Sequence, residues 1–263
     1  MKAYRITGTD IQPLPLVSAY RKGDVAADAY RRQAAGEIPK SDLNLSTCRF
    51  VRTILLDDGR FGRLASDEGS LLTVLLSGEL TLTMRGGATA RLVPGDVFLV
   101  DEESASLLGV DAHGACRLLQ AGVLPDWPGP GGEILSPGTI VHRNGEPKFT
   151  KIVKGDDDLA YFAPDWNPFP AMPGAWSESH QVLGLRFMCW EDGFLDWHPE
   201  VVNNFGIILS GELELEVSGD GAAHVFHAGD ICVAEDRTGV GHIDRCRGLV
   251  HVCLFVLDDE HLW

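Results

Sequence analysis

One stretch of this sequence occurs twice. The segment 74–84 reads VLLSGELTLTM, and 133 positions later the segment 207–217 reads IILSGELELEV. A second pair follows in the same order, because PGDVFLVDE at 94–102 matches AGDICVAED at 228–236. Two landmarks kept in order indicate a tandem duplication of one unit, with the extra residue of spacing placed in a surface turn. The chain is therefore expected to fold as two similar halves.

Both halves have the composition of antiparallel β-structure. From Arg49 to about Leu124, short runs of Val, Leu, Phe and Thr are separated by turn sequences, and the same pattern runs from Val182 to Val256. In LELEV at 213–217, apolar and acidic residues alternate, which predicts a strand with one buried and one solvated face. Many short strands at this spacing favour a sandwich or barrel over an open parallel sheet.

The pattern divides the chain into four segments. Residues 1–47 are predicted to form an N-terminal arm, in which the Ala-rich segment 18–36 favours a short helix. Residues 48–124 and 181–263 form the two β-rich units. Between them, residues 125–180 are dense in Pro and Gly and predict an irregular connection that contributes a strand or two.

Charge and composition exclude several classes of partner. The 263 residues carry a formal charge of −16, and a nucleic-acid surface needs Lys and Arg to displace counterions. No segment has the apolar length of a signal peptide core or a membrane helix, so a soluble cytoplasmic protein is expected. The six cysteines form no C-x-x-C pair and lie mostly in apolar runs, which predicts reduced, buried thiols.

The repeated landmarks also carry a family resemblance. A strand ending in LSGE, followed by a Gly-Asp that opens another strand, resembles the cupin superfamily, and its occurrence twice resembles a bicupin. The resemblance covers the two repeat units. It implies an all-β fold of two tandem double-stranded β-helix barrels of the jelly-roll type. It further implies a small-molecule ligand and a homodimer.

Metal-binding cupins are similar in their ligand spacing, which can be placed on this sequence from Gly211. The positions of the family's ligands are then occupied by His198, Glu200, Asn204 and His242. The resemblance implies that His198, Glu200 and His242 hold iron, manganese, nickel or zinc, with Asn204 as a weak fourth ligand or an orienting amide. Residues 198, 200 and 204 project from one face of an extended strand, which supports their convergence.

The same alignment gives the first half no such site. Its matching positions are Ala65, Asp67, Leu71 and Leu108, and of these only Asp67 could bind a metal. The C-terminal half is therefore expected to carry any chemistry, with the N-terminal half as a structural or dimerising unit.

Several further residues are candidates for the wall of a ligand pocket. Trp190 and Trp197 lie just before His198, Cys246 occupies a position where cupins often carry asparagine, and His251 alternates with Cys253 and Phe255 on the last strand. Aromatic packing at a barrel mouth explains the tryptophans equally well. A core or surface role explains His251, and solvent exposure is the alternative for Glu200.

Three functions are compatible with these residues, and none assigns a catalytic side chain. The first is a metal-dependent enzyme of dioxygenase, decarboxylase or isomerase type acting on a small organic molecule. The second is a metal-free bicupin that binds or senses a small ligand. The third is an oxoglutarate-dependent oxygenase, in which Arg245 or Arg247 would bind the carboxylate of the co-substrate.

Overall fold

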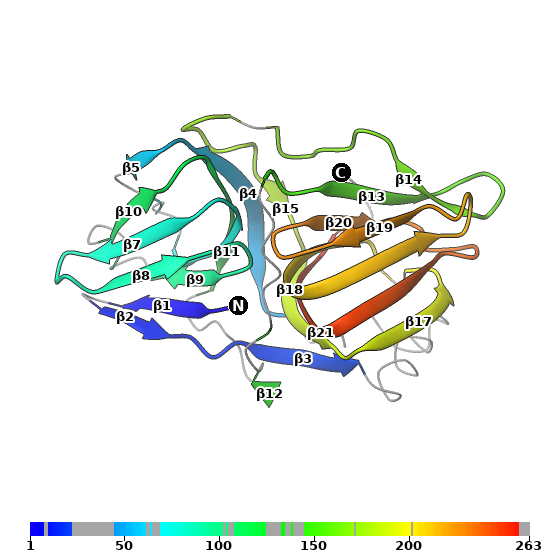
Figure 1. The fold of residues 1–263 in the computed structure, drawn as a ribbon, viewed down its shortest axis with the longest axis horizontal. Helices are drawn as coiled ribbons and strands as arrows, with labels where there is room; N and C mark the ends of the chain where they lie inside the picture. Colours follow the sequence, from blue (N-terminus) through cyan, green and yellow to red (C-terminus); the bar gives the residue numbers. More distant parts are fainter. Residues whose placement is uncertain are drawn as a thin grey trace.

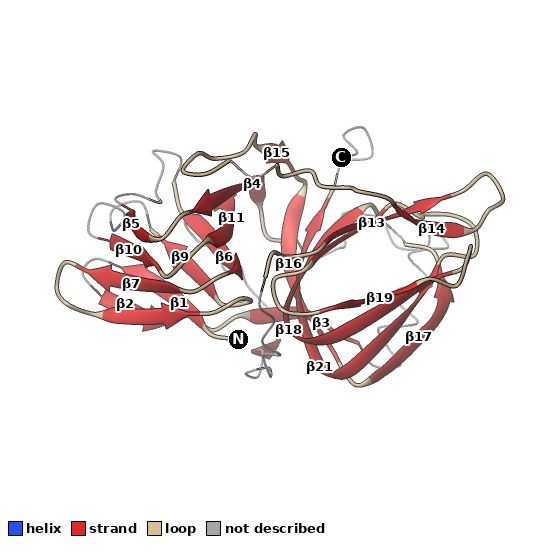
Figure 2. Cartoon of the chain, turned by 45° about the horizontal axis from the view of Figure 1, so that its top comes forward, coloured by secondary structure: helices blue, strands red, loops and turns tan. Residues whose placement is uncertain are grey.

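The computed structural model describes residues 1–7, 10–22, 45–61, 64, 69–101, 104, 108–124, 133–134, 138, 145–170, 172–200 and 202–257. Within these ranges the chain consists of β-strands, turns and loops, with no α-helix (Figures 1 and 2). This confirms the predicted all-β class. No helix in this part of the chain is long and apolar enough to cross a bilayer.

Two sheets form most of the N-terminal half. The larger has the order β15 (His180–Gln181), β4 (Cys48–Leu56), β11 (Cys116–Val123), β6 (Leu71–Ser77), β9 (Val97–Val100), β1 (Ala3–Thr7) and β2 (Asp10–Pro13). The smaller has the order β5 (Gly59–Phe61), β10 (Leu108–Ala112), β7 (Leu80–Met84) and β8 (Thr89–Leu92).

The C-terminal half is one continuous network of ten strands. Its main path is β12 (Glu133–Ile134), β3 (Val17–Lys22), β16 (Gly184–Trp190), β21 (His242–Val256), β18 (Asn204–Val217), β20 (Ile231–Ala234), β13 (Phe149–Lys154) and β14 (Ala160–Ala163). Two more strands attach to the long ones, because β17 (Gly193–His198) pairs with β21 and β19 (Ala223–Phe226) pairs with β18.

The two longest strands, β18 and β21, contribute to both layers of this half. Their segments 213–217 and 242–246 pair with each other and with β19 and β17. Their segments 204–208 and 250–256 also pair with each other, and with β20 and β16. The register shifts between the two segments, where Gly211 and Gly248 have φ of 82° and 72°. Glycine adopts this left-handed region without a Cβ penalty, so both strands can bend from one layer to the other.

Strand pairing recurs between the halves at the spacing of the sequence repeat. The parallel pair of Ala3 with Val97 has its counterpart in Phe149 with Ile231. The antiparallel pair of Val74 with Val97 likewise matches that of Ile207 with Ile231. The two copies of the repeated sequence therefore share these strand pairings.

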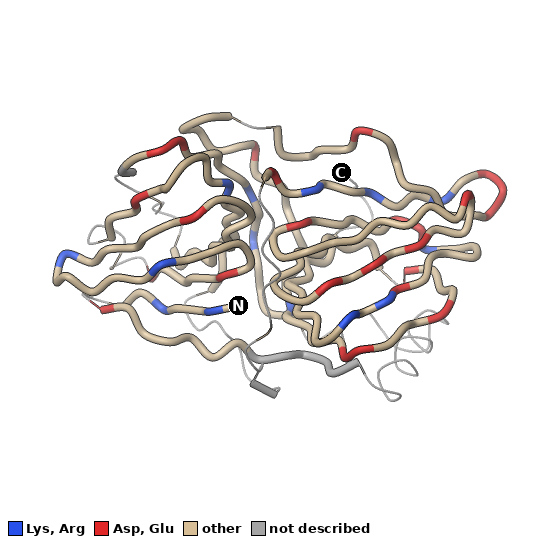
Figure 3. The backbone as a smooth tube through the Cα atoms, viewed as in Figure 1, with Lys and Arg blue, Asp and Glu red and all other residues tan. Residues whose placement is uncertain are grey.

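Residue alternation places the core as predicted. In β18, Leu213, Leu215 and Val217 are buried, while the glutamates between them are partly exposed. Those glutamates, at 212, 214 and 216, form ion pairs with Arg245 and Arg247 on the outer face of β21. Figure 3 shows these acidic and basic positions on neighbouring strands.

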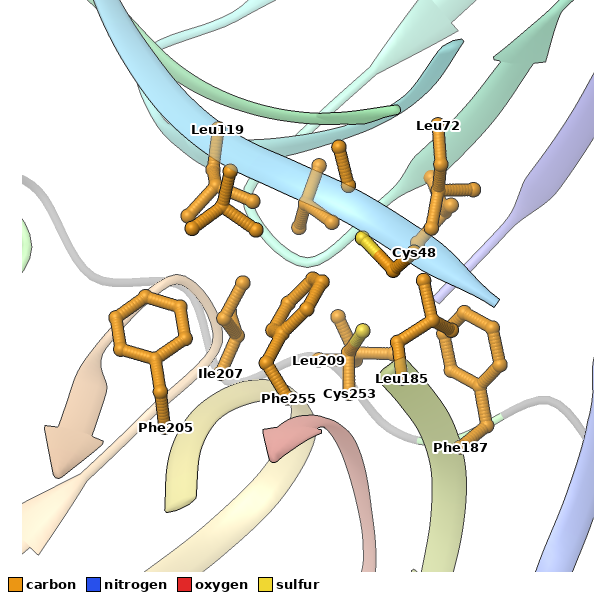
Figure 4. Packing of buried hydrophobic residues seen from close by; sticks show 14 of the residues in the cluster. Cys48, Leu72, Leu119, Leu185, Phe187, Phe205, Ile207, Leu209, Cys253 and Phe255 are labelled. Carbon is orange, nitrogen blue, oxygen red and sulfur yellow. The ribbon is translucent and has the colours of Figure 1, made fainter. Parts of the chain in front are cut away.

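A shared apolar core joins the two halves. Leu72 and Leu119 of the N-terminal sheet pack with Phe205, Ile207 and Phe255 of the C-terminal one in a single buried cluster (Figure 4). Burial of this much apolar surface is the main favourable term in association. The two halves are thus held together by a continuous core.

Two glycines make this contact close and reciprocal. A Cβ built on Gly95 would lie 1.9 Å from the carbonyl oxygen of Leu209, and one built on Gly229 would lie 1.9 Å from that of Leu76. These are the glycines of the repeated Gly-Asp turn, and the leucines precede the repeated Ser-Gly-Glu. The sequence landmarks therefore mark the places where each half meets the other.

The N-terminal segment differs from the predicted arm. The predicted helix over 18–36 is wrong for residues 18–22, which lie in strand β3 and pair with β16; residues 23–36 lie outside the described residues. Strands β1 and β2 belong to the N-terminal sheet, while β3 belongs to the C-terminal network. The local Ala-rich composition is overridden because β16 offers β3 an edge of unpaired backbone groups.

The six cysteines all lie in described residues, and all are buried with no disulfide between them. Burial raises the pKa of the Cys48 thiol to about 12. This agrees with the predicted reduced and buried thiols.

Candidate functional site

A cavity lies between the two layers of the C-terminal half. The cavity is partly open to solvent. Most of its wall is apolar, and the polar side chains in the wall are few. The lining residues are Arg186, Met188, Trp190, Glu200, Asn204, Gly206, Ile208, Leu213, Leu215, Cys232, Ala234, His242, Asp244, Val252 and Leu254. A mostly apolar pocket with a few convergent polar groups is the usual form of a small-molecule site.

Strand alternation decides which residues of β16 face this cavity. Arg186, Met188 and Trp190 line it, whereas Leu185 and Phe187 pack into the core between the two halves. Successive side chains of a strand point to opposite faces, so one short strand serves both purposes. Trp190, a predicted pocket residue, is one of the residues that line this cavity.

His242 lines the cavity, and His198 lies beside His242. They are paired residues of β21 and β17, and their ring centroids lie 4.7 Å apart. Asp244, two residues along β21, adds a carboxylate on the same side of that strand. One donor atom from each of His198, His242 and Asp244 lies within 4.8 Å of the other two, and this is the only such group among the described residues.

The hydrogen bonds of the two imidazoles leave both Nε2 atoms facing Asp244. Nδ1 of His198 lies 2.8 Å from the carbonyl oxygen of Asp196, and Nδ1 of His242 lies 2.7 Å from Oδ2 of Asp236. Since both partners accept, each Nδ1 carries a proton. The distances from Nε2 to the Asp244 carboxylate are 3.9 Å for His198 and 3.4 Å for His242. A second hydrogen bond that fixes the ring in this way is the usual support of a metal-binding histidine.

The surroundings of His242 favour positive charge. Burial alone lowers the pKa of His242, but hydrogen bonds to Asp236 and Asp244 and the charges of these carboxylates outweigh burial and hold the pKa well above its usual value. The two carboxylates thus favour positive charge at this place, where a bound cation would also neutralise them.

Glu200 lies beside this cluster. Its Oε1 is 3.9 Å from Nε2 of His242, and its backbone N–H donates to the carbonyl oxygen of Asp236 at 3.2 Å. The side chain is buried, so the alternative of a solvent-exposed Glu200 is wrong. A buried carboxylate at this position can serve as a fourth donor.

Asn204 lines the cavity from the other layer. It pairs with Ala234 and Val256, and its side-chain amide donates to the carbonyl oxygen of Val202 at 3.3 Å. Its predicted role as a weak fourth ligand or an orienting amide stays a prediction.

Three other predicted pocket residues do not line the described cavity. Trp197 is 42% exposed on β17. Cys246 is buried in the apolar cluster around Leu213. His251 lies toward the other half of the protein, where its Nδ1 is 2.6 Å from Oγ of Ser210.

Asp244 is the residue that sequence reasoning missed. It follows His242 by two positions in a strand, and this spacing alone places two side chains on one face. The ligand spacing of metal-binding cupins predicts ligands upstream of Gly211, and those positions are Glu200 and Asn204 in this sequence. A His-x-Asp pair in the last predicted strand was the available signal.

The matching region of the N-terminal half is apolar where it is described. Leu71 and Leu108 are both buried. Ala65 and Asp67 lie outside the described residues. Leu108, the counterpart of His242, contributes to a leucine-rich core in place of a polar site.

The two arginines proposed for an oxoglutarate carboxylate point elsewhere. Arg245 pairs with Glu214 and Glu216, and Arg247 pairs with Glu212 and Glu214, all on the outer face of the sheet. Neither lines the cavity. This excludes both as ligands for a molecule bound there.

Comparison with known proteins gives matches to solved structures only. No family model and no curated protein matches the chain. Solved structures that are similar include the cupin 2 conserved barrel domain protein from Leptotrichia buccalis, at 13% identity and a TM-score of 0.39, covering 81% of this chain and 88% of that one. Oxalate decarboxylase from Lactobacillus farciminis, in its formate complex, has 15% identity and a TM-score of 0.30, covering 80% and 77%.

A third similar structure is oxalate decarboxylase from Bacillus subtilis, described for its Mn(II) centres. It has 18% identity and a TM-score of 0.30, covering 81% of this chain and 70% of that one. These scores are too low to transfer an activity to this chain.

Proposed function

We propose that the C-terminal half is a metal-dependent cupin-type site for a small organic molecule, in a chain organised as a bicupin. His198, His242 and Asp244 would hold a divalent iron, manganese, nickel or zinc ion, with Glu200 beside them. The observation that carries the proposal is the convergence of two imidazole Nε2 atoms on one carboxylate at the wall of a cavity.

The donor set fits such an ion. Two histidines and one carboxylate are the ligands of the facial triad, which leaves coordination positions open for substrate. Asp236 and the backbone carbonyl of Asp196 hold the protons on Nδ1 and so keep both Nε2 atoms toward the site. The recurrence of strand pairing between the halves supports the bicupin organisation.

When bound, a divalent ion supplies Lewis-acid polarisation of a substrate oxygen. The residues of the chain supply the rest: the histidines and Asp244 fix the position of the ion, and the apolar walls limit access of water. Reactions of dioxygenase, decarboxylase or isomerase type are all compatible with this division of work, because fold alone does not select a reaction.

Metal content and metal-dependent stability test the proposal. Full-length protein purified without chelator is analysed for metals, and its unfolding temperature is measured with added Fe²⁺, Mn²⁺, Ni²⁺ or Zn²⁺. We expect close to one equivalent of metal and a rise in unfolding temperature, because a ligand that binds only the folded state stabilises it.

Two variants make this test specific. His242→Ala removes a proposed ligand and should abolish both effects. His113→Ala removes an exposed histidine of the N-terminal half and should leave them unchanged. Wild-type protein that takes up none of the four metals would reject the proposal.

One observation favours a second function, a metal-free ligand-binding module. The raised pKa of His242 means that a proton can satisfy Asp236 and Asp244 without an ion. In that case the cavity binds a small molecule for sensing or storage. The same metal titration separates the two functions, since only the first requires a metal.

A further inference from the structure

A buried arginine faces the proposed metal site across the cavity. Arg186 lies on β16, is 4% exposed and contributes to the cavity wall. Its neighbours across the sheet are Leu254 of β21 and, beyond it, Gly206 of β18, both of which also line the cavity. Arginine is rarely buried, and its guanidinium keeps its charge at every accessible pH.

The layer that carries Arg186 is opposite the layer that carries the metal-binding group. His242 and Asp244 pair with Val217 and Leu215 in the β17, β21, β18 and β19 layer. Arg186 belongs to the layer in which β16 pairs with the other end of β21. Stacked sheets lie about 10 Å apart, so a small ligand can reach both groups.

The side chains beside these two groups are mostly apolar. Met188, Trp190 and Ile208 continue the layer of Arg186, and Leu213 and Leu215 continue the layer of Asp244. Asn204 adds one neutral polar side chain to the layer of Arg186. This pattern suits a ligand with an anionic end and an apolar body.

We infer that the cavity takes a small carboxylic acid, whose carboxylate accepts hydrogen bonds from Arg186 while its apolar body lies against Met188 and Trp190. The inference rests on the proposed function in taking this cavity as the ligand site. A guanidinium has five N–H donors, and its planar fork matches a carboxylate in a bidentate manner.

Other ligand classes fit the wall less well. A phosphate dianion would bring two negative charges near Glu200 and Asp244, with Arg186 as the only arginine or lysine among the described residues of the cavity wall. A neutral sugar would leave most of its hydroxyl groups against apolar side chains, where each unpaired hydroxyl costs free energy. A monocarboxylate matches both the one arginine among the described lining residues and the apolar side chains beside it.

Calorimetric titration of the full-length protein tests the inference. The probes are benzoate and propionate, their uncharged counterparts benzamide and propionamide, and inorganic phosphate. We expect at least one of the carboxylates to bind more tightly than its amide and than phosphate. In Arg186→Gln its affinity should fall at least about tenfold, the loss typical of a charged hydrogen bond.

Two further variants control the result. Arg247→Gln removes an exposed arginine of the same half and should bind the carboxylate within twofold of wild type. Arg186→Lys keeps the charge without the fork, so it should show an intermediate loss, and it decides the test if Arg186→Gln does not fold. Equal binding of each acid and its amide, or unchanged affinity in both Arg186 variants, would overturn the inference.

Metal titration of the same samples separates this inference from the proposed function. Arg186→Gln should bind Mn²⁺ within twofold of wild type, because Arg186 is not among the proposed ligands. If wild-type protein binds no metal, but Arg186→Gln still binds the carboxylate more weakly than wild type does, the metal site is rejected and the carboxylate site is retained.

Discussion

Nδ1 of His242 lies 2.7 Å from Oδ2 of Asp236, a carboxylate that is fully buried. The other carboxylate oxygen of Asp236 has no hydrogen-bond partner among the described residues. His242 is therefore the hydrogen-bond partner of the Asp236 carboxylate among the described residues. A buried carboxylate is costly unless paired, so this contact ties the loop that follows β20 to the imidazole of the candidate site.

Asp236→Asn should weaken metal binding by about 10- to 100-fold, the usual effect of removing the outer partner of a metal-bound histidine. The physical reason is that an amide holds the Nδ1 proton less strongly and lowers the basicity of Nε2. Isothermal titration with Zn²⁺ measures the change. Asp220→Asn, in an exposed turn, is the matched control and should bind like wild type. Equal affinity in both variants would contradict this role.

Stability should fall as the pH is lowered from about 6.5 toward 4, in part because of His251. Burial, with the nearby N-terminal amino group adding to it, lowers the pKa of His251 to about 4. In the unfolded chain the pKa is about 6.5. Between these values the unfolded state binds a proton that the folded state does not, so unfolding becomes more favourable as pH falls.

Denaturant unfolding at several pH values checks this expectation. His251→Gln should show a shallower loss of stability over pH 6.5 to 4 than wild type, because glutamine does not titrate. His113→Gln, at an exposed position, controls for the loss of a histidine. The same pH slope in wild type and His251→Gln would show that His251 is not buried in its neutral form.

Gly229→Ala and Gly95→Ala should each destabilise the protein by about 2 to 4 kcal/mol. Both glycines have a left-handed backbone, with φ of 93° at Gly229 and 86° at Gly95. The added Cβ of each alanine would also overlap a carbonyl oxygen of the other half. Gly87→Ala has a similar φ of 91° but no atom within 4 Å of its Cβ, so about 1 to 2 kcal/mol is expected there. Chemical denaturation gives all three values. Equal losses at the three positions would show that the contact between the halves contributes nothing.

The sequence predicted the repeated topology because its two landmarks lie at fixed structural positions. Gly95 and Gly229 occupy the turn that meets the other half, and Leu76 and Leu209 receive them. Such contacts restrict the local sequence strongly, so the copies stay recognisable. The strand β3 was not predicted, because its partner β16 lies far along the chain and the local composition of 18–36 favours a helix.

The candidate site was predicted in part for a similar reason. His198 and His242 were placed by family spacing, and the structure brings them together. Asp244 was missed although period-two spacing from His242 indicates it. His251 was assigned to the pocket, yet the residues of this segment that line the cavity are Val252 and Leu254. The bend at Gly248 separates the two segments of β21, so alternation cannot be carried from His242 to His251.

Anomalous X-ray scattering from a crystal grown with Mn²⁺ or Zn²⁺ tests the central claim most directly. The account predicts one anomalous peak in the C-terminal half, within about 2.0 to 2.2 Å of Nε2 of His198, Nε2 of His242 and a carboxylate oxygen of Asp244. A peak bound by other residues, or no peak at saturating metal with the two histidines in the orientation described, would contradict it.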